Sequence, residues 1–314
     1  MPFARLLPMH RRRFLTTLGL GALGLLATPG VALAAVPDLR RKPIPGSGEL
    51  LPVIGMGTWQ TFNVGGDRKL LQQRTAVLRA FFAAGGGLVD CSPMYGSSAQ
   101  TLGFALEQLQ QPDSLFAAEK IWTRDGDATR RQLQEQARAW GIEQFELMQV
   151  HNLLNWEAHL PALKELKQAG RIRYLGVTTS HGRRHRELEQ ILSREPVDFV
   201  QLTYNIRNRE VEQRLLPLAR ERGIAVIANR PYAGGHLIKS LQRRARVPEW
   251  AQQAFQCRTW ADYLLKFLVS HPAVTCAIPA TTQVVHMREN MAAGRGPLPD
   301  NATRQRMIRH LETL

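Results

Sequence analysis

Residues 88–96, LVDCSPMYG, join a short apolar run to an acid, a proline and a tyrosine. The run ends in Asp90, Pro93 blocks its continuation, and Tyr95 follows in a loop that a glycine closes. A short apolar run bounded by turn residues is typical of a buried strand. This stretch therefore predicts a strand that carries a carboxylate to the rim of a pocket, with a phenol on the loop beyond it.

The same arrangement recurs twice further along the chain. Lys120 lies near the end of the apolar run LFAAEKIW, and His151 ends the run FELMQVH. Taken singly, such residues are usually explained by turns, caps or packing, although a lysine is rarely buried without a partner. Together with Asp90 and Tyr95, they place four ionisable residues at the ends of predicted strands, which indicates a proton-transfer site.

Strand-like and helix-like segments alternate along the rest of the chain. The expected helices span residues 68–84, 99–109, 128–140, 159–169, 184–193, 211–222, 284–292 and 301–313, and a longer irregular region follows AVIANRP at 225–231. Apolar strands separated by helices imply a parallel sheet covered by helices, and eight such units imply a (β/α)8 TIM barrel. We therefore expect an α/β fold with a single domain. A doubly wound sheet would need an early GxGxxG turn, which the glycines here do not supply.

The two ends of the predicted barrel carry further expectations. Residues 46–48 form a turn between strand-like residues, and this small hairpin would close the barrel floor. Only 24 residues follow Asn290. Most of this short segment is expected to be a final helix, over residues 301–313.

Several motifs match one known family in order. They are IGMGTW at 54–59, Asp90 and Tyr95 spaced as DxxxxY, Lys120 at a strand end, His151 before an asparagine, GVTTS at 176–180, QLTYN at 201–205, and IPATT and REN within 278–290. With this ordered set the chain resembles the aldo-keto reductase family from about Pro43 to its C-terminus. The resemblance implies a barrel enzyme that reduces aldehydes or ketones to alcohols with NAD(P)H.

The resemblance also implies a role for each residue of the constellation. Tyr95 would donate the proton to the carbonyl oxygen, and Lys120 beside it would lower the pKa of the phenol. Asp90 would pair with Lys120 and keep the ammonium charged, whereas His151 would hydrogen-bond the substrate carbonyl and orient it. Trp59 would form an apolar wall of the pocket. Relatives with tight pockets close them with longer C-terminal loops than the 24 residues that follow Asn290. The resemblance therefore implies a pocket that is open on that side and admits broad or bulky carbonyl substrates.

No side chain donates hydride, so carbonyl reduction needs a nicotinamide cofactor. The residues that the resemblance assigns to its binding are Thr179, Gln201, Asn229, Thr281, Arg288, Glu289 and Asn290. Asn229 stands where many relatives stack an aromatic ring on the nicotinamide, with Tyr232 three residues further on. The segment at Thr281 also lacks a lysine that is common in relatives. NADPH is the expected cofactor, and NADH is left open.

The first 34 residues are predicted to be a twin-arginine signal peptide. Arg11 and Arg12 precede Phe14, an apolar stretch follows, and small residues fit a cleavage site before Ala35. The apolar stretch falls short of the roughly 18–20 residues that a membrane span needs, so no stable membrane insertion is expected after cleavage. Residues 35–45 are then a linker, residues 46–314 are the barrel, and the protein is expected in the periplasm by the twin-arginine route.

The chain is basic, with a net charge of +15, or +11 without the four arginines of the leader. These charges are scattered and not interleaved with aromatic residues, so nucleic-acid binding is not expected. The three cysteines are far apart and show neither a disulfide framework nor metal spacing, and no metal is expected. Two functions stay open: a carbonyl reductase, and an exported nicotinamide-binding or regulatory protein with little turnover.

Overall fold

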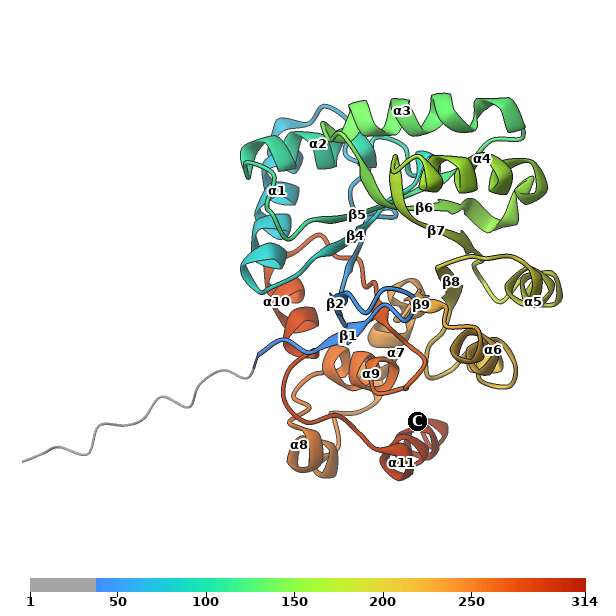
Figure 1. Cartoon of the computed structure of the whole chain (residues 1–314). Coiled ribbons are helices and arrows are strands. Elements are labelled where there is room, and N and C mark those ends of the chain that lie inside the picture. Colours follow the sequence, from blue (N-terminus) through green and yellow to red (C-terminus); the bar gives the residue numbers. More distant parts are fainter. Residues whose placement is uncertain (1–37) are drawn as a thin grey trace, which may run out of the picture. The chain divides into compact units, whose positions relative to one another are not determined.

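The structure, a computed structural model, describes residues 38–314, and the predicted signal peptide lies outside them. Within this range, eight parallel strands form one sheet in the order β3 to β10 (Figure 1). Their bounds are β3 (Met56–Gly57), β4 (Leu88–Asp90), β5 (Phe116–Ile121), β6 (Phe145–Val150), β7 (Ile172–Thr178), β8 (Phe199–Thr203), β9 (Ala225–Asn229) and β10 (Cys276–Ala277). A parallel bridge from Ile54, just before β3, to Ala277 joins the two edges. The sheet therefore forms the predicted (β/α)8 barrel.

A helix follows each of these strands and covers the outside of the barrel. The helices that agree with the expected ranges are α1 (Arg68–Ala83), α2 (Ser98–Gln108), α3 (Thr129–Trp140), α4 (Trp156–Gln168), α5 (His185–Arg194), α6 (Leu215–Glu221), α10 (Val284–Ala292) and the terminal α11 (Asn301–Glu312). None of the helices in residues 38–314 is both long enough and apolar enough to cross a membrane.

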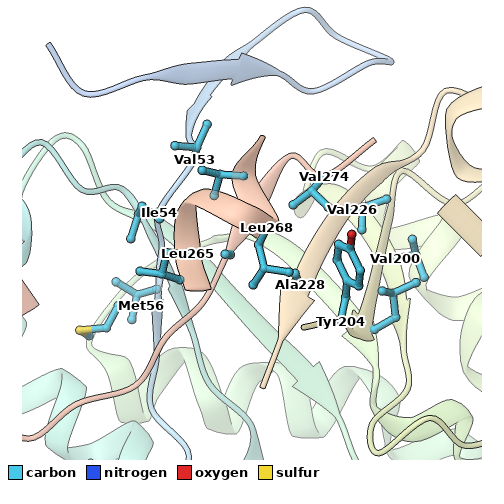
Figure 2. Packing of buried hydrophobic residues seen from close by; sticks show 14 of the residues in the cluster. Val53, Ile54, Met56, Val200, Tyr204, Val226, Ala228, Leu265, Leu268 and Val274 are labelled. Atoms are coloured by element: carbon cyan, nitrogen blue, oxygen red, sulfur yellow. The ribbon is translucent and has the colours of Figure 1, made fainter. Parts of the chain in front are cut away.

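The region after β9 is not irregular, so that expectation is wrong. It forms α7 (His236–Arg244), α8 (Glu249–Phe255) and α9 (Trp260–Val269). Helix α9 begins with a capping box, in which Thr259 and Asp262 each accept a backbone N–H of the other. Every residue of α9 is buried, so its sequence lacks the polar stripe that marks a surface helix. Figure 2 shows Leu265 and Leu268 of α9 packed between the chain at Ile54 and strand β9.

A hairpin of β1 (Arg41–Pro43) and β2 (Leu50–Pro52) closes the barrel floor, as predicted. Ile44 and Leu51 belong to the apolar cluster that fills this end of the barrel, together with Phe116 and Phe199 at the beginnings of β5 and β8. Strand β1 lies inside the segment 35–45 that was expected to be a linker, so the boundary at 46 is too late. Lys42 of β1 donates to the carbonyls of His271 and Val274 at 2.8 and 2.7 Å, and these distant partners hold the strand.

Close packing of the strands explains why a residue without a side chain precedes β3. A Cβ atom on Gly55 would lie 2.9 Å from the carbonyl oxygen of Leu88 and 3.0 Å from Sγ of Cys276. Since real Cβ atoms do not approach so closely, glycine lets this chain reach both neighbouring strands. Gly55 therefore allows the first and last strands of the barrel to close on each other.

Candidate active site

The carboxyl ends of the strands surround a cavity of about 250 Å³. The predicted site residues that line it are Trp59, Asp90, Tyr95, His151, Thr179, Gln201 and Asn229. Lys120 lies behind this surface on β5 and is fully buried. No described residue beyond Ala280 lines the cavity, which agrees with a pocket that the C-terminal segment does not close.

The centre of the site is a buried ion pair between Asp90 and Lys120. Lys120 Nζ lies 2.7 Å from both carboxylate oxygens and donates to the carbonyl of Cys91 at 2.6 Å. Burial opposes the charge on Lys120, but the carboxylate of Asp90 outweighs this effect, and the pKa of the lysine is raised. The ammonium is therefore charged at physiological pH.

Two amides complete the surroundings of the Asp90 carboxylate. Gln201 Nε2 donates to Oδ1 at 2.7 Å, and Gln149 Nε2 approaches the same oxygen at 3.4 Å. The hydroxyl of Thr58 holds the backbone carbonyl of Asp90 at 2.9 Å. Sequence reasoning missed Gln149 and Thr58, although a glutamine inside the apolar run of β6 was a readable signal. These contacts fix the carboxylate and, through it, the position of Lys120.

Tyr95 ends the short helical turn Pro93–Tyr95 that follows β4. Lys120 Nζ lies 5.1 Å from the centroid of its ring. Burial raises the pKa of Tyr95, and the positive charge of Lys120 lowers it by a smaller amount. The effect of Lys120 on the pKa of the phenol thus has the expected sign, but burial outweighs it. The phenol is therefore protonated at neutral pH and poised as a donor.

His151 is buried, and its ring meets the Tyr95 ring edge to face at 5.8 Å. Burial and the charge of Lys120 lower the pKa of His151 well below its usual value, so the imidazole is neutral. Its Nδ1 lies 2.7 Å from Oγ of Ser92, which also accepts the N–H of Met94. We assign the Ser92 hydroxyl as the donor and Nδ1 as the acceptor of this hydrogen bond. The ring hydrogen of the neutral imidazole then lies on Nε2, which is free to donate to a substrate carbonyl. Sequence reasoning missed Ser92, which lies only two residues after Asp90.

Three of the expected cofactor residues meet at the ends of β7, β8 and β9. Asn229 Nδ2 donates to the carbonyl of Thr179 at 3.0 Å and to Oε1 of Gln201 at 3.3 Å. Gln201 is thus held by Asn229 on one side and by Asp90 on the other. The buried hydroxyl of Thr179 has no partner among residues 38–314. A polar ligand group in the cavity would satisfy it.

The remaining expected cofactor residues lie at or on α10, outside the cavity lining. They are Thr281, Arg288, Glu289 and Asn290. Arg288 is exposed, whereas Asn290 is buried and accepts the Tyr232 hydroxyl at 2.6 Å. Tyr232 also lines the cavity, so it links the cavity to α10. Asn290 Nδ2 has no partner in the described part of the chain and is the second unpaired buried polar group on this side.

A model of the aldo/keto reductase family matches residues 53–305, and the chain belongs to this family. Methylglyoxal reductase YeaE of Escherichia coli (strain K12) is 28% identical over 260 residues, which cover 81% of this chain and 89% of that protein. An aldo/keto reductase of Klebsiella pneumoniae, solved with NADP and acetate, superposes with a TM-score of 0.73 at 24% identity over 85% of this chain and 94% of that one. The thermostable aldo-keto reductase Tm1743, solved with the inhibitor epalrestat, gives 0.72 at 26% identity over 87% and 99%.

Family membership decides between the two functions that the sequence left open. The protein is an oxidoreductase of the aldo/keto reductase type, which reduces carbonyl groups with NAD(P)H. The complete set of Asp90, Tyr95, Lys120 and His151 around one cavity agrees with turnover and not with cofactor binding alone.

Proposed function

We propose that the protein reduces an aldehyde or ketone to the alcohol with NADPH, and that Tyr95 donates the proton. The observation that carries this proposal is the cluster at the cavity wall. The Tyr95 ring lies 5.1 Å from the buried ammonium of Lys120 and edge to face with His151. One face of the cavity thus combines a proton donor, a fixed positive charge and a neutral hydrogen-bond donor.

A nicotinamide cofactor held in the cavity would supply a hydride, that is one proton with two electrons, to the carbonyl carbon. As the C=O double bond becomes single, the oxygen gains negative charge and takes the proton of Tyr95. Lys120 stabilises the phenolate that remains, and solvent returns the proton afterwards. His151 Nε2–H holds the carbonyl oxygen, which orients the carbon and stabilises the developing charge.

The chain offers a polar surface that fits a nicotinamide nucleotide. The unpaired Thr179 hydroxyl lies where the strand ends meet, and the unpaired Nδ2 of Asn290 lies on α10. Buried polar atoms without partners are costly, so both fit the polar groups of a ligand. Gln201 and Asn229 would hold the nicotinamide end, whereas Thr281, Arg288 and Glu289 would hold the adenosine end. Arg288, exposed on α10, is the proposed contact for the phosphate that distinguishes NADPH from NADH.

The proposed location is outside the cytoplasmic membrane, after export by the twin-arginine route. The support is in the sequence alone: Arg11 and Arg12 before Phe14, and small residues before Ala35. Residues 1–34 are the proposed signal peptide. A folded barrel would carry one bound cofactor through this route, because the twin-arginine route accepts folded proteins.

The proposed reaction is tested with purified protein, NADPH and a panel of aldehydes. We expect cofactor fluorescence to be quenched on binding and NADPH absorbance to fall when a reactive aldehyde is added. A parallel series with NADH measures cofactor preference. Quenching without oxidation across the whole panel would contradict a reductase and support the low-turnover binding protein.

A further inference from the structure

Arg230 lies at the rim of the cavity, directly after strand β9. Its guanidinium carbon lies 5.6 Å from the centroid of the Trp59 ring. An arginine over an indole keeps its planar face on the ring and its N–H donors free at the edge. The guanidinium of Arg230 thus lies at the cavity wall beside the apolar surface of Trp59.

The positive charge of Arg230 has no carboxylate partner in residues 38–314. The only carboxylate that lines the cavity is Asp90, and Lys120 already neutralises it. No ion pair of Arg230 occurs in the described chain. The neighbouring His181 adds no negative charge, and burial, Arg230 and Arg183 lower its pKa. The rim therefore carries one half-buried cation that no carboxylate among residues 38–314 compensates.

The backbone holds Arg230 in a fixed and uncommon conformation. Its φ is +52°, in the left-handed region that non-glycine residues seldom adopt. Its carbonyl accepts Nδ2 of Asn205 at 3.2 Å and the N–H of Ala233 at 3.0 Å. Such conformations persist where the surroundings enforce them, and they cluster at ligand sites. The side chain is thus aimed by its backbone and by Trp59.

The strand order places Trp59 between the proton donor and this cation. Around the barrel, β4 precedes Tyr95, β3 precedes Trp59, and β9 precedes Arg230, with β10 between the last two. A substrate with its carbonyl at Tyr95 would therefore extend along the Trp59 ring toward Arg230. The cavity would bind the far end of that substrate by its charge.

We propose that Arg230 binds an oxyanion of the substrate, so that the enzyme prefers aldehydes or ketones that also carry a carboxylate. This inference rests on the proposed reductase function and assigns its substrate class. The phosphates of the cofactor offer the same oxygen chemistry, and the test must distinguish these two sources.

The test compares two aldehydes of similar shape, 4-carboxybenzaldehyde and its methyl ester. Wild-type protein should show a higher kcat/KM for the acid than for the ester. In Arg230→Met the ratio of the two values should fall about 10- to 100-fold, because one charged hydrogen-bonded contact is lost. Arg230→Lys keeps the charge without the fork and should recover part of the preference.

Arg183→Met is the matched control. It removes an exposed arginine near the rim that does not line the cavity. It should leave the ratio within about twofold of wild type, because solvent and salt screen an exposed charge. Added salt should reduce the preference of the wild type but not that of Arg230→Met.

A binding measurement tests the role of Arg230 without turnover. Benzoate, which cannot be reduced, is titrated into the protein–NADPH complex, and Arg230→Met should weaken its binding by a similar factor. Equal binding of benzoate to both proteins, or no preference of the wild type for the acid, overturns the proposal. The proposal is also overturned if Arg230→Met weakens NADPH binding and lowers kcat/KM equally for both aldehydes, because Arg230 would then bind the cofactor phosphates. If neither aldehyde is oxidised or reduced, the proposed reaction fails, and the benzoate titration still tests Arg230.

Discussion

Replacing Lys120 with methionine tests the buried ion pair in depth. The change keeps the length of the side chain but removes its charge. Asp90 then loses two contacts of 2.7 Å, and the Cys91 carbonyl loses its donor at 2.6 Å. Only the amides of Gln201 and Gln149 remain on the buried carboxylate. Breaking a buried pair in this way costs about 3–5 kcal/mol, so we expect that loss in the free energy of unfolding.

The same change should weaken catalysis for a separate reason. The phenolate of Tyr95 loses the cation that stabilises it, so the pKa of the phenol rises further. We expect turnover to fall at least about 100-fold, with the limb of the pH profile that belongs to Tyr95 moved to higher pH. Urea denaturation measures the stability, and NADPH oxidation over a range of pH measures the activity.

The double variant Asp90→Asn/Lys120→Met separates the two effects. It removes both charges, so stability should return to within about 2 kcal/mol of the wild type, as neutral replacements of buried pairs do. Turnover should stay low. Lys167→Met provides a matched control, because Lys167 pairs with Asp198 at 2.6 Å where both side chains are partly exposed, and its loss should cost about 1 kcal/mol or less. A single Lys120 variant as stable as the double variant would refute this reasoning.

Four further outcomes are expected. Ser92→Ala should lower kcat about 2- to 10-fold, the worth of one hydrogen bond, and equal kcat would reject the assigned His151 tautomer. The pKa of His151 is lowered in the folded protein, so the unfolded chain binds the proton more readily. The free energy of unfolding of the wild type should therefore be at its full value above about pH 6.5 and decline below it. In urea titrations, the free energy of unfolding of His151→Gln should decline less steeply with falling pH. Arg288→Leu should raise KM about three- to fivefold for NADPH but not for NADH. Arg11→Lys/Arg12→Lys should leave active, unprocessed protein in the cytoplasm, because a receptor that recognises guanidinium geometry rejects lysine. Fractionation and N-terminal sequencing measure this outcome, and normal export of the variant would exclude the twin-arginine route.

The barrel and its central residues could be predicted because parallel strands are buried on both faces. Their sequences are continuous apolar runs, and an ionisable residue at the end of such a run is conspicuous. Asp90 and Lys120 therefore stood out in the sequence, and the structure brings them within 2.7 Å. The order of strands around a barrel follows the order of the chain, so neighbouring strand ends could be paired without coordinates.

Other features depended on packing that no local pattern records. Helix α9 is buried on every side, so its sequence has no helical stripe, and only the Thr259–Asp262 capping box marked its start. Strand β1 is held by Lys42 through carbonyls more than 200 residues away. The net pKa shift of Tyr95 depends on how deeply its ring is buried, and the sequence shows only the charges beside it.

The residues at the rim of the cavity also differ in how far the sequence revealed them. Asn229 drew attention because it replaced an expected aromatic ring, whereas Arg230 beside it looked like one of many scattered arginines. Its importance depends on the contact with Trp59 and on the absence of a carboxylate around it in the described chain. Both facts belong to the three-dimensional arrangement.

The central claim is that Tyr95 donates the proton during carbonyl reduction, and Tyr95→Phe tests it most directly. The ring is kept, so NADPH should bind as in the wild type by fluorescence titration. Turnover of a reactive aldehyde should fall about 100-fold or more, whereas Tyr174→Phe, which removes a phenol at the barrel floor, should keep wild-type turnover. Undiminished turnover in Tyr95→Phe, with NADPH still bound, would contradict the assignment.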